Sequence, residues 1–360
     1  MRIPARCLLT VVLVCASGGI SAVDGPFQLE RDDRIVIAGN TFAERMALYG
    51  YFETLLHCRF PDHRLVVRNL GWSGDEVDLM PRPANFGSFH EHLKWHKADV
   101  TFLCFGLNES FAGDRGIDPW RDRLTRFLSA LEEQTFHRTP PRLVLISPIA
   151  HEDLGPPLPT GDAIVERNRI LGAYTAVMKE VAEARGVRFL DLFTPTRDAM
   201  EVPGAPKLTF NGIHLTERGY HQVSRMMARS LGLWGEGGEG PALDPPAAPA
   251  AERLRRQIYE KNRLFFLFWR PLNPFYIWGG RAYCWKRDEP MIELERLAQM
   301  IDAREREIWS TRKPPTDAVW ATPPGDREIW EEPLDHAAHA EGSDDLPPQL
   351  DSVRRNGVIK

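Results

Sequence analysis

The chain has 360 residues, with 45 Lys or Arg against 50 Asp or Glu, so its formal net charge is -5. A net charge of this sign gives no electrostatic footprint for nucleic acid, and we expect no such partner. The length allows one sizeable α/β core with an appendage.

The first 22 residues are typical of an export signal. Arg2 and Arg6 form a basic start, residues 7–14 an apolar core, and residues 20–22 a plausible cleavage site. This core is too short to span a bilayer, and no later apolar run is long enough to do so. We therefore expect an exported protein, periplasmic or extracellular, without a transmembrane segment. Removal of the signal would leave three cysteines, Cys58, Cys104 and Cys284. An odd number of cysteines argues against a disulfide framework.

Five short apolar segments are predicted to be buried parallel strands. They are residues 34–39, 64–69, 99–106, 142–148 and 187–192. Apolar residues at helical spacing occur between them, at residues 42–56, 120–133 and 163–184, and residues 216–231 would form the closing helix. Alternating strands and helices predict a parallel sheet with helices on both faces, which is a three-layer α/β sandwich. We expect this domain to span residues 30–234.

The composition changes after this domain. Residues 235–251 are rich in Gly, Pro and Ala and are expected to be a linker. Residues 252–312 predict a helical extension, whose aromatic cluster at Phe265–Trp269 should pack back onto the main domain, because so many exposed rings would form a large apolar patch. Stacking of these rings on sugars is the alternative. Residues 313–360 are expected to be disordered, since they have too little apolar pattern for a core.

Four short motifs directly follow predicted strands or lie in the last long loop. They are Gly39-Asn40-Thr41, Asn69-Leu70-Gly71-Trp72-Ser73-Gly74, Gly106-Leu107-Asn108-Glu109 and Asn211-Gly212-Ile213-His214. An open α/β sheet places its active site in the crevice beyond the carboxyl ends of its strands. We therefore expect the four loops to meet in one cleft.

This set of motifs resembles the SGNH (GDSL-type) hydrolase family, whose patterns are Gly-Asp-Ser, Asn-x-Gly-x-Ser-Gly, Gly-x-Asn-Asp and Asp-x-x-His. The resemblance covers about residues 34–233 and does not include the C-terminal third. It implies an SGNH-like (flavodoxin-like) fold and acyl transfer from an ester or an acetylated carbohydrate. It also implies that no metal or organic cofactor is needed.

Carried over position by position, the resemblance makes Thr41 the nucleophile and His214 its base, with Asn211 as the group that orients the base. The oxyanion would be bound by the backbone N–H groups of Thr41 and Gly74 and by the side-chain amide of Asn108. Asn40 belongs to the same motif as Thr41 and is a further binding candidate.

Two positions depart from the family pattern, because Thr41 stands where the family has serine and Asn211 where it has aspartate. The methyl group of threonine restricts its rotamers and crowds the attack. Asparagine lacks the negative charge that stabilises an imidazolium, and loss of the equivalent charge in a serine protease lowers kcat about 10⁴-fold. Another carboxylate could take over this role, and the candidates are Glu44, Glu109 and Glu152. The main alternative is a catalytically degenerate protein that binds a carbohydrate or another ligand in the same cleft.

Two other patterns compete with this interpretation. The run from Gly71 to Gly74 resembles an α/β-hydrolase elbow with Ser73 as nucleophile, but Asp75 occupies the last glycine position. The helically spaced His90, His92 and His96 could bind a metal ion. No carboxylate or cysteine completes that set, so a polar helix is the preferred interpretation and no metal site is predicted.

Overall fold

The computed structural model describes residues 25–233, 248–277, 281 and 289–311. The predicted signal at residues 1–22, most of the predicted linker, Cys284 and the predicted tail at residues 313–360 lie outside these residues. None of the helices in the described ranges combines the length and the apolar character that a membrane crossing needs.

A sheet of five parallel strands forms the centre of the molecule, in the order β2-β1-β3-β4-β5. The strands are β1 (Arg34–Gly39), β2 (Val66–Asn69), β3 (Val100–Cys104), β4 (Arg142–Ile146) and β5 (Arg188–Leu190). All five predicted strands are confirmed, although most are shorter than expected. β3, for example, ends before Gly106, whose φ of 100° lies outside the range of a strand.

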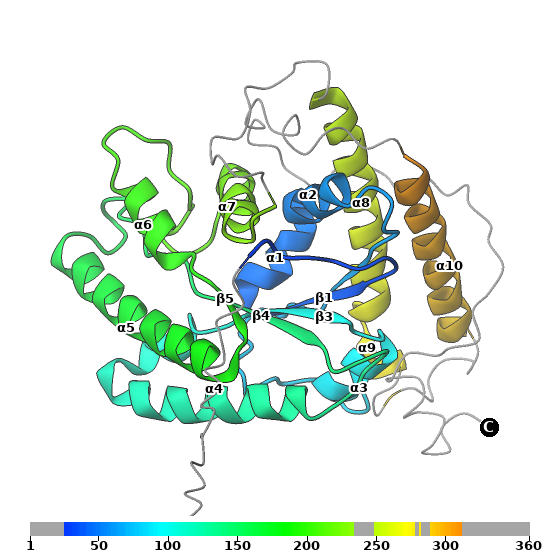
Figure 1. Ribbon diagram of the computed structural model, residues 1–360, viewed down its shortest axis with the longest axis horizontal. Coiled ribbons are helices and arrows are strands. Elements are labelled where there is room, and N and C mark those ends of the chain that lie inside the picture. Colours follow the sequence, from blue (N-terminus) through cyan, green and yellow to red (C-terminus); the bar gives the residue numbers. More distant parts are fainter. Residues whose placement is uncertain (1–24, 234–247, 278–280, 282–288, 312–360) are drawn as a thin grey trace, which may run out of the picture.

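Helices cover both faces of the sheet (Figure 1). They include α1 (Thr41–Tyr49), α2 (Tyr51–Arg59), α3 (Phe89–Trp95), α4 (Ile117–Glu132), α5 (Asp162–Arg185), α6 (Phe193–Met200) and α7 (Glu217–Ser230). Ile35 and Ile37 of β1 pack in one core with residues of α1, α2 and α7. Val36 and Ala38 pack in a second core with residues of α4 and α5. Because side chains alternate along a strand, one short strand contributes to both cores, and the predicted three-layer sandwich is confirmed.

The apolar spacing over residues 42–56 is divided between two helices. Gly50 has φ 66° and ψ 8°, and its N–H donates a hydrogen bond to the carbonyl of Met46. This left-handed residue ends α1, and α2 starts at the next position. The periodic pattern did not reveal the break, because it reports which side chains are apolar and not the conformation of one glycine.

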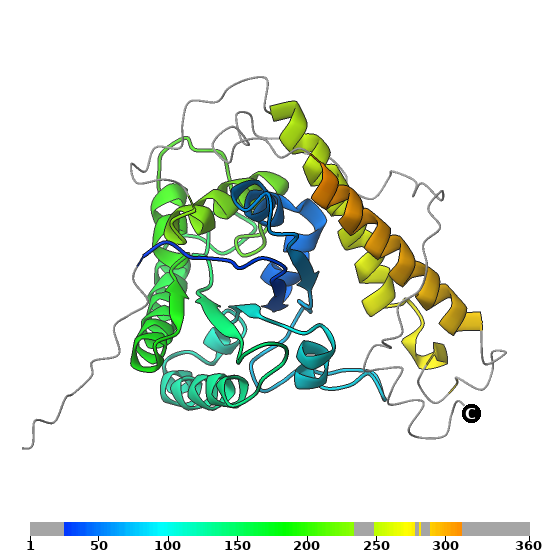
Figure 2. The same ribbon diagram turned by 45° about the vertical axis from the view of Figure 1, so that its right-hand side comes forward.

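The C-terminal extension covers an edge of the sheet. It consists of α8 (Ala248–Trp269), α9 (Pro274–Ile277) and α10 (Glu289–Ser310), so α8 begins within the predicted linker. α10 packs on α8, as Figure 2 shows. α8 contacts β2, and Glu305 of α10 pairs with Arg68 of β2. Lys261 donates to the carbonyl of Val67 (2.9 Å) and the Trp309 indole to that of Leu65 (3.0 Å). These bonds satisfy carbonyl groups at an edge that would otherwise invite another strand.

The extension is held by apolar contacts and by buried ion pairs. Phe265, Phe268 and Trp269 are all buried in the core on the α4 side of the sheet, which confirms that the aromatic cluster packs on the main domain. These three rings are therefore not free to stack on sugars. The Lys261 ammonium lies 2.7 Å from the carboxylate of Glu53, and both groups are buried. A buried pair of this kind is costly to break from one side.

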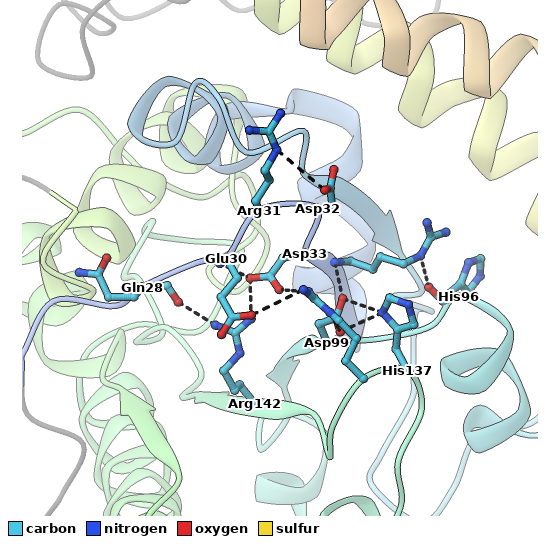
Figure 3. Close-up of polar contacts among 11 residues, drawn as sticks. Gln28, Glu30, Arg31, Asp32, Asp33, His96, Asp99, His137 and Arg142 are labelled. Carbon is cyan, nitrogen blue, oxygen red and sulfur yellow. Dashed lines mark hydrogen bonds and ion pairs between the residues drawn. The ribbon is translucent and has the colours of Figure 1, made fainter.

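Charged side chains join the amino ends of the strands (Figure 3). Asp33 is fully buried and pairs with Arg142 and with Arg138 (2.7 Å). Arg138 also contacts Asp99 (3.1 Å), which accepts a hydrogen bond from the backbone N–H of Arg34. Burial alone would raise the pKa of Asp99, but these hydrogen bonds leave it below its usual value. The network ties together the starts of β1, β3 and β4, at the end of the sheet opposite to the four motifs.

Candidate active site

The first motif forms the turn from β1 into α1. Asn40 is buried and caps α1, because its side-chain oxygen accepts from the N–H of Phe42 (3.1 Å). Its own N–H donates to the carbonyl of Cys104 (3.2 Å). A side chain on Gly39 would place its Cβ 2.0 Å from that same carbonyl oxygen, so only glycine fits there. Asn40 thus fixes the backbone beside Thr41, and its oxygen is already occupied by the cap.

Thr41 occupies the first position of α1 and is partly buried. Within the described residues, neither its hydroxyl nor its N–H makes a hydrogen bond. A free N–H at a helix N-terminus favours negative charge, because the helix dipole has its positive end there. The position suits an attacking hydroxyl next to a donor for an oxyanion.

The second motif packs against the first turn of α1. Asn69 donates to the carbonyl of Ala43 (2.7 Å) and accepts from the N–H of Gly71 (2.9 Å). A Cβ on Gly71 would lie 2.3 Å from the backbone nitrogen of Glu44. Close approach without a side chain therefore brings this loop onto α1.

Gly74 and Asn108 come together through Asp75. Gly74 has φ 87° and is exposed, and its N–H has no acceptor among the described residues. Asn108 donates from its side-chain amide to the carbonyl of Asp75, the next residue (3.1 Å). An amide nitrogen carries two hydrogens, so one donor of Asn108 is left for a ligand. Both groups lie where the resemblance places oxyanion donors.

Glu109 links these two loops through hydrogen bonds to their backbone. It is buried, and its carboxylate accepts from the N–H groups of Gly106 (2.8 Å) and Val77 (3.2 Å). Burial raises the pKa of Glu109 to about 7, although the backbone hydrogen bonds oppose this shift. Glu109 therefore ties the Gly74 loop to the end of β3.

The fourth motif places Asn211 against the ring of His214. The Asn211 side-chain oxygen accepts from the backbone N–H groups of Ile213 (3.3 Å) and His214 (2.9 Å). This orients the amide, and its nitrogen lies 2.9 Å from Nδ1 of His214, while its oxygen lies 3.2 Å away. The shorter contact favours donation from Asn211 to Nδ1, which leaves the ring proton on Nε2. Burial, and to a lesser degree Arg45, lower the pKa of His214.

None of the three candidate carboxylates contacts His214 in the described residues. Glu152 is buried, and its carboxylate accepts from the backbone of Leu208 (3.0 Å) and from the backbone and hydroxyl of Thr209 (2.7 and 2.6 Å). Glu109 is occupied as described above. Glu44 accepts from the Ser73 hydroxyl (2.6 Å). Each carboxylate supports a loop of the site, and the partner of His214 is Asn211.

The structure brings the four loops to one edge of the sheet. Glu44 and Asn69 link the start of α1 to the Gly74 loop, and Asn108 holds that loop from β3. The loop that carries His214 leads into α7, and Tyr220 of α7 donates a hydrogen bond to the carbonyl of Phe42 in α1 (3.0 Å). Thr41 and His214 are not hydrogen-bonded to each other in this state.

The competing patterns have other roles. Ser73 lies in a loop that continues through turns, and the next helix starts only at Phe89, so there is no strand-to-helix elbow. The helix expected for the histidines is present as α3, but His92 in it and His96 at its end are buried, so these two do not belong to a polar face. His92 lies between the carbonyl of Phe86 (3.0 Å) and the Trp269 indole (3.3 Å), and burial lowers its pKa to about 4. In the described ranges, no cluster of His, Cys, Asp or Glu is arranged to hold a metal ion.

Two arginines beside the site, Arg82 and Arg270, were not found from the sequence. Both contact the ring of Trp72 in the second motif, with the Arg270 guanidinium carbon 3.8 Å and the Arg82 carbon 4.3 Å from the ring centroid. Arg270 comes from the C-terminal extension, outside every motif. Its only signal in the sequence is its position next to the aromatic cluster.

Comparison with known proteins places the chain in a family. The model of the GDSL-like Lipase/Acylhydrolase family matches residues 38–222. No curated protein matches the sequence. One similar solved structure is BT4096, a gut microbial diltiazem-metabolizing enzyme, with 14% identity, 82% of this chain and 98% of that chain covered, and a TM-score of 0.55.

Two further similar structures cover less of this chain. One is a catalytic mutant of Axe2, an acetylxylan esterase from Geobacillus stearothermophilus, with 16% identity, 57% and 96% coverage and a TM-score of 0.45. Another is an alpha/beta hydrolase enzyme from the metagenome of Lake Arreo, Spain, with 17% identity, 57% and 97% coverage and a TM-score of 0.44. The family model spans more than half of the chain and contains all four motif loops, so this protein belongs to the GDSL-like lipase/acylhydrolase family.

Proposed function

We propose that this protein is an exported acylhydrolase that cleaves an ester or an acetylated carbohydrate through the hydroxyl of Thr41. The observation that carries the proposal is the set of unengaged groups at the start of α1. The hydroxyl and N–H of Thr41 and the N–H of Gly74 have no partner in the described residues, and the amide of Asn108 is held on the carbonyl of Asp75, next to Gly74. A nucleophile next to preorganised donors is what acyl transfer requires.

In the proposed reaction, the Thr41 oxygen attacks the carbonyl carbon of the ester. The carbonyl oxygen becomes an oxyanion, which the N–H groups of Thr41 and Gly74 and the amide of Asn108 bind. His214 removes the hydroxyl proton through Nε2 and delivers it to the leaving alcohol. Water then attacks the acyl-threonine with His214 again as base, which releases the acid and restores the hydroxyl.

The hydrogen bond from Asn211 to His214 makes this reaction slow in our proposal. With the ring proton on Nε2, His214 cannot accept a proton there, so Asn211 must first turn its oxygen toward Nδ1. This same contact favours a second candidate function, in which the cleft binds a carbohydrate or ester ligand without turning it over.

A comparison of two threonine variants tests the proposal. Purified full-length protein should release acid from a short chromogenic acetyl ester and from an acetylated oligosaccharide, and Thr41→Ala should abolish this release. Thr194→Ala is the matched control, because Thr194 is an exposed threonine in the first turn of α6. If Thr41→Ala keeps the full rate, Thr41 is not the nucleophile. If the wild-type protein binds the oligosaccharide but never releases acid, the binding function is correct.

Export is supported by the basic start and apolar core of residues 1–22. Expression of the full chain in a bacterial host should yield a secreted or periplasmic protein whose N-terminal sequence begins at Val23. An intact N-terminus on cytoplasmic protein would contradict this part of the proposal.

A further inference from the structure

The end of the C-terminal extension contacts the loop that carries Gly74. The chain turns just after α8, where the N–H of Arg270 donates to the carbonyl of Phe266 (2.8 Å). The Arg270 side chain is 20% exposed and reaches Glu44 in the first turn of α1, with Nη1 3.1 Å from the carboxylate. This contact is an ion pair without hydrogen-bond geometry. The extension therefore places a positive charge close to Thr41.

Glu44 transmits this contact to the second motif. Its other carboxylate oxygen accepts from both the N–H and the hydroxyl (2.6 Å) of Ser73. Ser73 directly precedes Gly74, whose N–H is the proposed oxyanion donor. Arg270, Glu44 and Ser73 thus form a continuous polar chain from the extension to that donor.

Trp72 supplies a second route from the extension to the same loop. The guanidinium carbon of Arg270 lies 3.8 Å from the Trp72 ring centroid and that of Arg82 lies 4.3 Å from it. Arg82 also pairs with Asp75 (2.6 Å). The rings of Trp269 and Trp72 also form a T-shaped contact, with their centroids 5.5 Å apart. The residues on both sides of Ser73-Gly74 are therefore held by charged side chains.

We propose that the C-terminal extension completes the active site, with Arg270 as a positioning residue that fixes the Gly74 N–H toward the oxyanion. This inference rests on the proposed acylhydrolase function. Arg270 acts through Glu44 and Trp72 and does not itself touch the substrate. Docking of the extension relies on other contacts, such as Lys261 with Glu53 and Arg68 with Glu305. Removal of Arg270 should therefore leave the extension in place.

Kinetics of full-length variants provide the first test. Arg270→Gln should lower kcat about tenfold or more and change KM by less than about twofold, because the oxyanion donor acts in the transition state. The kcat of Arg270→Lys should lie between those of the wild type and Arg270→Gln, because lysine keeps the charge but loses the planar stacking on Trp72. Arg304→Gln is the matched control, because Arg304 lies in α10, has a similar exposure of 16% and pairs with Glu260 of α8 (3.2 Å).

Hydrogen exchange provides a second test that does not depend on turnover. Arg270→Gln should speed amide exchange in the peptide that covers residues 71–76, whereas Arg304→Gln should leave this peptide as in the wild type. Thermal unfolding checks that both variants remain folded.

The two tests separate the inference from the proposed function. An inactive wild-type protein would refute the acylhydrolase, and exchange alone would then decide whether Arg270 positions the loop. An active wild type in which Arg270→Gln matches Arg304→Gln in kcat and in exchange would overturn the inference while the acylhydrolase stands. A rise in KM with unchanged kcat would also overturn it, because that result indicates a substrate contact.

Discussion

Asn211→Asp should convert a slow catalyst into a fast one. Asn211 contacts Nδ1 of His214 through its amide nitrogen at 2.9 Å, and its oxygen is bound by backbone N–H groups. An aspartate keeps the oxygen that caps these N–H groups. Its second oxygen replaces the amide nitrogen and can only accept, so the ring proton moves to Nδ1. Nε2 is then free to take the proton of Thr41.

The size of the effect follows from charge and distance. Two unit charges 4 Å apart interact by about 1 kcal/mol in water and about 4 kcal/mol near a protein surface. His214 is partly buried, so the new carboxylate beside it should raise the pKa of the His214 ring in the variant. The reverse change in a serine protease suggests that kcat could rise by up to about 10⁴-fold.

Ester hydrolysis and NMR of the histidine ring nitrogens together measure this prediction. The rate should rise in Asn211→Asp, and the His214 signals should change from the Nε2–H to the Nδ1–H tautomer. The double variant with Thr41→Ala is the control and should remain inactive. If the tautomer changes and the rate does not, His214 is not the base for Thr41, and the reasoning fails.

Three further predictions concern the site and its support. Thr41→Ala and His214→Ala should each lower the rate nearly as much as the double variant does, because the effects of residues that act as one unit are not additive. Losses that add up in the double variant would show independent roles. Burial raises the pKa of Glu109 from its ordinary 4.5 to about 7, so the folded protein binds the extra proton between these values and its stability falls as pH rises through that window. In urea unfolding, Glu109→Gln should lose this part of the pH dependence, and an unchanged slope would argue against the shift. Lys261→Met leaves the buried Glu53 carboxylate without its ammonium partner and should lower the free energy of unfolding by about 3–5 kcal/mol. A urea midpoint equal to that of the wild type would contradict this prediction.

The sequence by itself predicted the sheet and the order of the motif loops. Buried parallel strands have continuous apolar runs, such as Ile35–Ala38, and these runs are local properties of the chain. Parallel strands direct their carboxyl ends to one edge, so a motif that follows each strand can be placed without coordinates. The same reasoning predicted that the aromatic cluster of the extension is buried, since its rings are too apolar to remain exposed.

Only the tertiary structure decided which groups are engaged at that edge. Glu152 and Glu109 could have been free carboxylates from their spacing, but each binds backbone N–H groups of a loop distant in sequence. The tautomer of His214 depends on the orientation of one amide, which its backbone contacts set. Arg270 reaches Glu44 across more than two hundred residues of chain, and no local pattern encodes such a contact. Local periodicity determines which side chains are buried, whereas the partner of a polar group depends on how the whole chain packs.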